Sequence, residues 1–310
     1  MNRHALADHA TAVAGALLTG GGSFFADSVE SPSLEVMIEH VAVGVPPLDG
    51  EGAYELTAET PVGTLDPAVL VHQWVGPTAP TVVYHHGNGE SPFEVGRFAT
   101  NTFRDIFVEG ADDVAGLNLV AIRAPYHTLS TREYARVVRD LERFVATLAT
   151  SVVVVDEVVT QLAASAPVFV AGISLGGWVT TLHRTYRNTA TGYVPLLAGA
   201  RLGDLFVDSG YRRLVGGTGA ANPDRLRATL NFDDDFQQVT TRNLHPLLAR
   251  YDQYIVFETE APTYADYDVT VLEKGHVTAT LDTDALRAHV VETVRAATEP
   301  QSGSEWTVTD

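Results

Sequence analysis

One short motif combines a possible nucleophile with glycines at fixed positions. Gly172, Ser174 and Gly176 form a Gly-x-Ser-x-Gly pattern that follows the apolar run 168–171 and precedes a helical pattern. Glycines two residues before and two after the serine permit a turn so tight that any Cβ there would clash with neighbouring chain. Such a turn projects the serine oxygen above a sheet, beside the free N–H groups of a helix N-terminus. The pattern therefore predicts a nucleophile at Ser174.

A nucleophilic serine needs a base that accepts its proton and an acid that orients the base. At a strand-to-helix turn of this kind the expected chain order is serine, acid, histidine. The histidines after His183 are His245, His276 and His289. We predict His276 as the base, because it lies just past the apolar run 267–272, where a loop side chain can reach the serine. His289 falls in a helical pattern and His245 at the start of a strand.

The acid is predicted at Asp252. This residue follows the apolar run 245–250 and precedes His276 by 24 residues, an interval that fits a loop, a helix at 257–265 and a strand. It is thereby placed at the carboxyl end of a strand, where catalytic groups gather in α/β sheets. The alternatives are aspartates of the preceding segment, namely Asp204, Asp208 and Asp233 to Asp235.

A glycine-rich turn follows the first buried run. Residues 81–84 lead into the sequence His-His-Gly-Asn-Gly-Glu at 85–90. Glycines let backbone N–H groups face a site, so we expect one oxyanion donor from near Asn88 and another from Leu175, the residue after the serine. In the alternative interpretation the turn is only tight, and the Asn88 side chain braces it.

Two other kinds of site are not favoured. His85, His86 and His127 could supply metal ligands, but adjacent histidines on a strand point to opposite faces, and no His-Glu-x-x-His spacing is present. Gly87 and Gly89 lack the third glycine and the helix of a dinucleotide-binding turn. We therefore expect neither a metal nor an organic cofactor.

Apolar runs alternate with helical patterns along most of the chain. Continuous apolar runs are typical of strands buried on both faces, and they occur at 81–84, 117–122, 168–171, 193–197, 245–250 and 267–272. Helices are predicted from the capping box at Ser130 to residue 148, and at 152–164, 176–188, 224–230 and 284–297.

The first part of the chain predicts strands of another kind. Residues 36–45, 55–60 and 69–75 are β-rich and alternate loosely, as expected for an antiparallel edge. The whole pattern predicts an α/β fold with a mostly parallel central sheet, helices on both faces and an antiparallel N-terminal edge. We expect one domain over residues 1–310, with an N-terminal extension at 1–33 and a polar tail at 299–310. Residues 200–243 are too long for an ordinary connection and are interpreted as a lid or cap.

The order of these features resembles the α/β-hydrolase superfamily. The resemblance rests on the His-Gly-rich turn at 85–90, the Gly172–Gly177 sequence, a later aspartate and the Gly275-His276 pair, and it covers roughly residues 65–298. A Pro-Tyr-His sequence at 125–127 also resembles uncharacterised members of this superfamily. The resemblance implies an eight-stranded sheet, a serine-nucleophile triad and hydrolysis of an ester, amide or related bond, although the fold hosts many chemistries.

These residues and this resemblance together favour a serine hydrolase of the carboxylesterase type. Ser174, Asp252 and His276 would form the triad, and a small-molecule ester or acyl compound would be the substrate, hydrolysed through an acyl-enzyme. Two alternatives stay open at this point. One is acyl transfer or peptidase chemistry on the same triad, and the other is a binding protein that keeps the fold without catalysis.

The charge balance limits the partners. Asp and Glu number 39 against 20 Lys and Arg, giving a net charge of −19, and Lys274 is the one lysine. So negative a field repels nucleic acid and anionic membranes. The lysine-poor, acidic composition resembles proteins of halophilic organisms, in which salt screens the self-repulsion.

Targeting signals are not evident in the sequence. No apolar run of about 18 residues without a charge is present, so a membrane span is not expected. Asp8 and His9 interrupt the alanine-rich stretch before Leu18, so we expect a short helix there rather than a signal peptide, and a cytoplasmic protein. Cysteine is absent, which excludes disulfides and thiolate chemistry.

Overall fold

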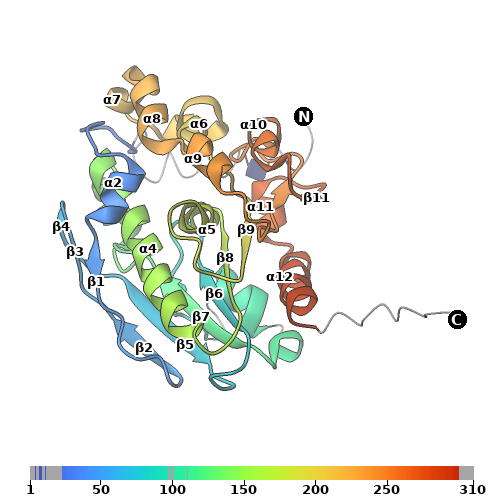
Figure 1. Ribbon diagram of the computed structural model, residues 1–310. Coiled ribbons are helices and arrows are strands. Elements are labelled where there is room, and N and C mark those ends of the chain that lie inside the picture. The colour runs from blue at the N-terminus through green and yellow to red at the C-terminus, as the bar shows by residue number, and fades with distance from the viewer. Residues whose placement is uncertain are drawn as a thin grey trace, which may run out of the picture.

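Eight strands form one mixed sheet at the centre of the molecule (Figure 1). The structure is a computed structural model that describes His4, Ala7, Asp8, Thr11 and residues 23–96, 99, 101–109 and 111–299. The strands of this sheet are β2 (Gly52–Glu55), β5 (Ala68–Gln73), β6 (Thr81–His85), β7 (Asn118–Arg123), β8 (Val168–Ile173), β9 (Gly192–Leu196), β10 (Leu247–Ala249) and β11 (Thr270–Leu272). Their order is β11-β10-β9-β8-β6-β7-β5-β2.

Strand direction divides the sheet into a parallel part and an antiparallel edge. All neighbours from β7 to β11 pair in parallel, whereas β5 is antiparallel to both β7 and β2. A separate three-stranded sheet is formed by β1 (Ala42–Val43), β3 (Ala58–Thr60) and β4 (Gly63–Leu65). The predicted α/β fold class, with its antiparallel N-terminal edge, is confirmed.

The central strands are buried on both faces, which explains their continuous apolar sequences. Every residue of β6, β7 and β8 is buried. Val83, Val120 and Val170 pack into the core on one face, while Val82 and Leu119 pack into the core on the other. Full burial of such a side chain contributes about 1.5–3 kcal/mol.

Helices cover both faces of the sheet (Figure 1). One face carries α2 (Leu34–Glu39), α4 (Leu141–Leu162) and α5 (Leu175–Tyr186). The other face carries a π-helical turn at Arg104–Val108 and the long α12 (Thr283–Thr298).

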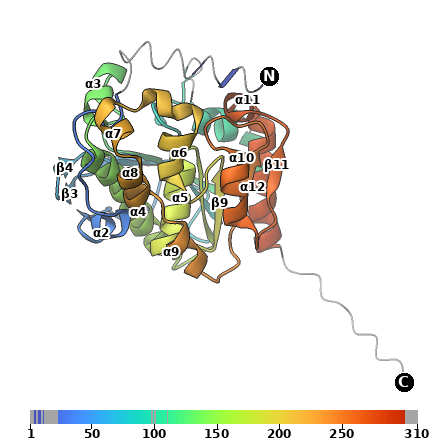
Figure 2. The same cartoon turned by 90° about the horizontal axis from the view of Figure 1, so that it is seen from above.

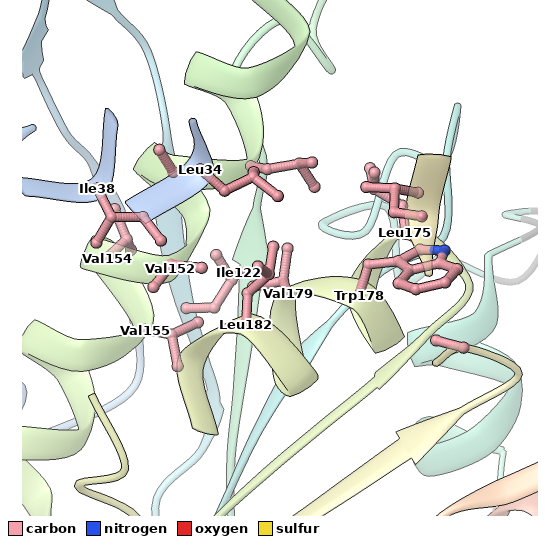
Figure 3. Packing of buried hydrophobic residues seen from close by; sticks show 14 of the residues in the cluster. Leu34, Ile38, Ile122, Val152, Val154, Val155, Leu175, Trp178, Val179 and Leu182 are labelled. Carbon is pink, nitrogen blue, oxygen red and sulfur yellow. The ribbon is translucent and has the colours of Figure 1, made fainter. Parts of the chain in front are cut away.

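Aliphatic side chains join α4, α5 and the sheet. Figure 3 shows Ile122 of β7 beside Val152 and Val155 of α4 and Val179 and Leu182 of α5. All of these side chains are fully buried. Within the part of the chain that the structure describes, α4 is the one helix long and apolar enough to cross a membrane, but 72% of its most apolar stretch is buried in the fold. We therefore interpret α4 as a core helix.

The prediction of a strand at 36–45 is wrong over most of its length. Residues 34–39 form α2 instead, and only Ala42–Val43 is a strand. Ser33 caps the helix by accepting the backbone N–H of Val36 at 3.3 Å. The residues that α2 buries recur at helical spacing: Leu34, Met37 and Ile38.

The break between the next two helices also differs from the prediction. Ser130 and Glu133 form the predicted capping box, but the helix that they open, α3 (Thr131–Val137), is short. The chain restarts at Leu141, where Asp140 caps α4 by accepting the N–H of Glu142 at 3.0 Å. The valine-rich stretch after residue 151 therefore continues α4 without a break. The predicted helix before Leu18 lies largely outside the described residues, and the predicted polar tail lies outside them beyond Glu299.

The segment predicted as a lid is helical. It contains α6 (Leu202–Asp208), a 3-10 helix (Gly210–Leu214), α7 (Gly217–Ala221), α8 (Pro223–Leu230) and α9 (Asp233–Gln238). Seen from above, α6 lies over α5 (Figure 2). We call residues 200–243 the helical cap. Its motion as a lid stays a prediction.

A buried carboxyl anchors the start of the helical cap. Glu260, at the end of α10 (Phe257–Glu260), accepts the backbone N–H groups of Ala200 at 3.1 Å and Arg201 at 3.4 Å. Burial of this side chain raises its pKa to about 8, although both hydrogen bonds oppose the shift. Glu260 is therefore protonated in the folded protein over much of the range in which an unfolded glutamate is charged.

The stability of the protein should depend on the protonation of Glu260. Its contribution is fully present below the unfolded pKa of 4.5 and is lost as the pH rises towards 8. We expect the free energy of unfolding of the wild type, measured with urea, to fall between pH 5 and pH 8 by at least about 1 kcal/mol more than that of Glu260→Gln. Glu258→Gln, on the exposed side of α10, should behave as wild type. An equal pH dependence of wild type and Glu260→Gln would contradict this assignment.

Candidate active site

The turn between β8 and α5 holds Ser174 in a strained conformation. The backbone of Ser174 has φ 53° and ψ −111°, a combination that residues other than glycine rarely adopt. A Cβ at Gly172 would overlap the carbonyl of Gly176, and a Cβ at Gly176 would overlap the carbonyl of His85 and lie 2.8 Å from that of His86. The predicted reason for both glycines is thus visible in the structure.

A chain of hydrogen bonds connects Ser174 to a carboxylate. The hydroxyl oxygen of Ser174 lies 3.2 Å from Nε2 of His276, and Nδ1 of His276 lies 2.7 Å from Oδ2 of Asp252. An N–H at Nδ1 that donates to Asp252 leaves Nε2 as the acceptor for the Ser174 hydroxyl. The structure therefore brings together the three residues that the sequence singled out.

Two strand ends position Asp252 and His276. Asp252 follows β10, and His276 opens α11 (His276–Thr280) shortly after the neighbouring strand β11. The other carboxylate oxygen of Asp252 accepts the backbone N–H groups of Tyr254 and Ile255, each at 2.8 Å. These bonds fix the buried carboxylate so that its remaining oxygen faces the imidazole.

The electrostatic surroundings favour a protonated His276. Burial opposes the charge, but the field of Asp252, its hydrogen bond and the charge of Asp8 together raise the pKa of His276 above its ordinary value. A raised pKa makes the imidazole a stronger base for the Ser174 proton.

The alternative acids have other partners. Asp204 is paired with Arg201 and Arg227, each at 2.7 Å, and Asp208 is paired with Arg227 at 2.6 Å. Asp233 lies 3.6 Å from Arg201. These ion pairs hold the helical cap together, and among the described residues none of these three aspartates is hydrogen-bonded to His276. His289 bonds the carbonyl of His245 at 3.0 Å, away from Ser174.

Two neighbouring cavities open beside Ser174. The inner chamber, of about 30 Å³, is lined by Ser174 itself and by mainly apolar side chains of α5 and the helical cap, among them Leu175, Trp178, Leu205 and Phe206. The outer chamber, of about 290 Å³, has a more polar lining that includes Ser91, Tyr126, His127 and Thr131. Three residues line both: Phe24, Asn88 and Tyr211.

The side chain of Asn88 forms part of the wall between the chambers. Its carbonyl oxygen accepts the hydroxyl of Tyr134 at 2.7 Å, and its amide donates to the hydroxyl of Tyr211 at 3.4 Å. The side chain therefore braces the turn, as the alternative interpretation proposed. The oxyanion role of the backbone N–H groups of Asn88 and Leu175 stays a prediction.

The histidines near this turn correct one sequence argument. His85 and His86 do not point to opposite faces, because β6 ends at His85 and the two rings stack 4.8 Å apart. His127 lies 4.5 Å from the His86 ring. Burial lowers the pKa of His85 to about 3 and that of His127 to about 4, so both are neutral. No group of three or more His, Asp or Glu residues suited to a metal ion occurs in the described ranges.

Sequence reasoning missed two carboxylates at the site. Glu90 accepts both the backbone N–H and the hydroxyl of Thr102, at 3.0 and 2.7 Å, and its Oε1 lies 2.8 Å from where a Cβ on Gly87 would be. Asp8 was noted only as an interruption of an apolar stretch. No local pattern links either residue to its partners, which lie 12 and more than 240 residues away.

Comparison with solved structures identifies the fold. Acetyl xylan esterase 1 from Thermoanaerobacterium sp. JW/SL YS485 aligns with a TM-score of 0.53 at 14% identity, over 87% of this chain and 96% of that chain. Est1E from Butyrivibrio proteoclasticus aligns with a TM-score of 0.51 at 13% identity, over 78% and 99%. An acylaminoacyl peptidase from Pyrococcus horikoshii aligns at 0.50 and 16% identity, over 80% of this chain and 41% of that chain.

These similarities show that the chain has the α/β-hydrolase fold. No protein-family model and no curated protein matches its sequence. The fold and the eight-stranded sheet agree with the resemblance seen in the sequence.

The glycine requirement of the turn can be measured. We expect Gly176→Ala to lower the free energy of unfolding by about 3 kcal/mol or more, because its Cβ would overlap backbone carbonyls that cannot move independently of β6. Gly217→Ala is the matched control, since Gly217 begins α7 and has nothing within 4 Å of its added Cβ. Its stability should change by less than about 1 kcal/mol. Thermal unfolding of both variants measures this difference. A Gly176→Ala variant as stable as Gly217→Ala would contradict the steric explanation of the turn.

Proposed function

We propose that this protein is a serine hydrolase of the carboxylesterase type, with Ser174 as nucleophile, His276 as base and Asp252 as orienting acid. The observation that carries the proposal is the hydrogen-bonded sequence Asp252–His276–Ser174, placed at a strained turn beside an apolar chamber. Solved structures with this fold include enzymes named as esterases, which supports the same reaction class.

The geometry supports a two-step reaction. The oxygen of Ser174 attacks the ester carbonyl while Nε2 of His276 takes the hydroxyl proton, and Asp252 stabilises the imidazolium. The oxyanion would be bound by the N–H of Leu175, at the start of α5, and by a second N–H near Asn88. His276 then returns the proton to the departing alcohol. A water molecule, deprotonated by His276, attacks the acyl-enzyme, releases the acid and restores the Ser174 hydroxyl.

A second reaction on the same residues is favoured by one comparison. The acylaminoacyl peptidase from Pyrococcus horikoshii shares the fold, so cleavage of an amide bond is the main alternative. Acyl transfer would differ only in the acceptor that takes the acyl group from Ser174. A panel of matched ester, amide and acceptor-alcohol substrates separates these three outcomes.

The two chambers favour an ester with a short acyl group and a larger alcohol. The inner chamber beside Ser174 is small and mainly apolar, which suits a short hydrocarbon chain. The outer chamber is about ten times larger and carries hydroxyl, amide and imidazole groups that suit a polar leaving group. We therefore propose that the acyl group enters the inner chamber and the alcohol lies in the outer one.

The composition supports a salt-rich working environment. With a net charge of −19 and one lysine, the folded chain repels itself strongly, and molar salt shortens the range of that repulsion to about 3 Å. We propose that the protein acts in the cytoplasm of a cell that maintains high salt. Activity assays therefore belong in high salt.

Loss of the nucleophile tests the proposed function. We expect Ser174→Ala to lower kcat/KM for a short-chain aryl ester by at least about 10³-fold and to abolish labelling by a fluorophosphonate probe. Ser165→Ala is the matched control, because Ser165 is exposed in the turn that precedes β8, at the opposite end of the strand from Ser174. Its labelling and turnover should equal those of the wild type. A folded wild type that is neither labelled nor active would refute the proposal.

Acyl-chain preference tests the use of the inner chamber. We expect kcat/KM of the wild type to fall steeply as the acyl chain of the ester grows from acetyl to octanoyl. Leu205→Ala enlarges the inner chamber and should raise kcat/KM for the longer chains about 10-fold, the effect of one or two methylenes. Leu117→Ala, a half-buried leucine remote from both chambers, should leave the preference unchanged. An unchanged preference in Leu205→Ala would place the acyl group elsewhere.

A further inference from the structure

One buried carboxylate near the N-terminus contacts both loops that carry the acid and the base. Asp8 is fully buried. Its Oδ2 accepts the backbone N–H of His276 at 2.9 Å and that of Gln253 at 3.1 Å, and its Oδ1 accepts the N–H of Val277 at 2.9 Å. Figure 2 shows the described part of this N-terminal segment beside α11. Asp8 thus bonds the residue that follows Asp252 and the backbone of His276 itself.

The contact with α11 replaces a cap that the local sequence lacks. The first N–H groups of a helix have no partner within the helix, and they are usually bound by the side chain of the preceding residue. That residue is Gly275, which has no side chain to offer. Asp8 supplies the missing acceptors from a distant part of the chain, and its negative charge suits the positive end of the helix dipole.

Gly275 also makes the approach of Asp8 possible. A Cβ at this position would lie 2.8 Å from Oδ2 of Asp8 and 2.9 Å from the carbonyl oxygen of His4. Both distances are shorter than real Cβ contacts, so only glycine fits against this segment. The glycine before His276 and the aspartate at position 8 therefore form one packing arrangement.

Further contacts hold the segment in place. The hydroxyl of Tyr254 donates to the backbone carbonyl of Asp8 at 2.6 Å, and the backbone N–H of the same tyrosine donates to Asp252. Nδ1 of His4 lies 2.9 Å from the hydroxyl of Thr278 in α11, and the His4 ring stacks on Tyr251. His4 and Asp8 are thereby bound on one side to the loop that follows Asp252 and on the other to α11.

We propose that Asp8 is a positioning residue of the active site. It fixes the loop of Asp252 and the first turn of α11 relative to each other, so that His276 faces both Asp252 and Ser174. This role rests on the proposed function of the triad. Asp8 touches neither the substrate nor the reacting atoms; it acts through the backbone of His276 and through its charge.

The charge of Asp8 has a second consequence for His276. The groups that face this imidazole are Asp252 from the β10 loop, Asp8 from the N-terminal segment, the Tyr254 ring at 5.1 Å and the Ser174 hydroxyl. Flanking charges are paired with each other, namely Lys274 with Asp282 and Arg250 with Glu273. Asp252 and Asp8 both raise the pKa of His276.

This charge predicts the direction of a pH effect. Catalysis needs neutral His276, so kcat/KM rises with pH through the raised pKa of this group. Removing the charge of Asp8 lowers that pKa and moves the acidic limb of the profile to lower pH, even while the loss of positioning lowers the maximum rate.

The test compares three variants of matched size or charge. Asp8→Asn keeps an acceptor oxygen without the charge, and Asp8→Glu keeps the charge with altered reach. Asp140→Asn is the control, because Asp140 also caps a helix, α4, but lies outside the site. We expect Asp8→Asn to lower kcat about 10- to 100-fold with KM changed less than 3-fold, and to shift the acidic limb down by about 0.5 pH unit. Asp8→Glu should keep the limb near its wild-type position, and Asp140→Asn should match the wild type in kcat and in the limb.

A second measurement separates this proposal from the proposed function. The titration of the His276 imidazole can be followed by NMR in the Ser174→Ala background, where turnover plays no part. A lower pKa on adding Asp8→Asn supports the proposal even if no substrate is ever hydrolysed, and failure of probe labelling in the wild type refutes only the hydrolase. Unchanged kcat, limb and His276 titration in a folded Asp8→Asn would overturn it. So would a loss of activity without any shift in the limb or in the titration, because that result would assign Asp8 a purely structural role.

Discussion

The close contact between the first turn of α5 and the end of β6 is the constraint on which the site depends. A Cβ at Gly176 would overlap the His85 carbonyl, so the helix can begin this near the sheet only with glycine at that position. The same contact gives the backbone of Ser174 its positive φ and points the hydroxyl towards His276. The strain at one residue is sustained by the burial of β6 and β8 on both faces. The strained backbone of the turn costs free energy, and the burial of the surrounding core offsets that cost.

Buried charge is the second condition of the site. A carboxylate loses much hydration when it is buried, and it remains ionised only where N–H groups and positive charge replace the water. Asp252 and Asp8 receive two and three backbone N–H groups respectively. Glu260 also receives two N–H groups, but its burial, with a smaller contribution from the charge of Asp204, raises its pKa to about 8. At Glu260, two backbone donors do not offset the cost of burying the charged carboxylate.

The sequence predicts those parts of the molecule that depend on local pattern. Apolar runs identified the buried strands because burial on both faces leaves few polar positions, and the spacing of glycines identified the turn at Ser174 because sterics act within a few residues. The strand predicted at 36–45 was wrong because the cap at Ser33 and the burial of Leu34, Met37 and Ile38 on one helix face outweigh the β propensity of the branched residues there. Asp8 could not be assigned, since its contacts arise only when backbone more than 240 residues away lies beside it.

The contact between Asp8 and α11 also determines when the site can first exist. Asp8 precedes His276, whose backbone N–H it binds, by 268 residues in the chain. Closing so long a loop costs entropy that only a nearly complete core can offset. The turn of Ser174 can form when β6 and β8 have been synthesised, but Asp252 and His276 take up their positions beside it only after β11 and α11 have been synthesised. A chain synthesised only as far as α5 therefore contains the glycine turn of Ser174 without the partners of its hydroxyl.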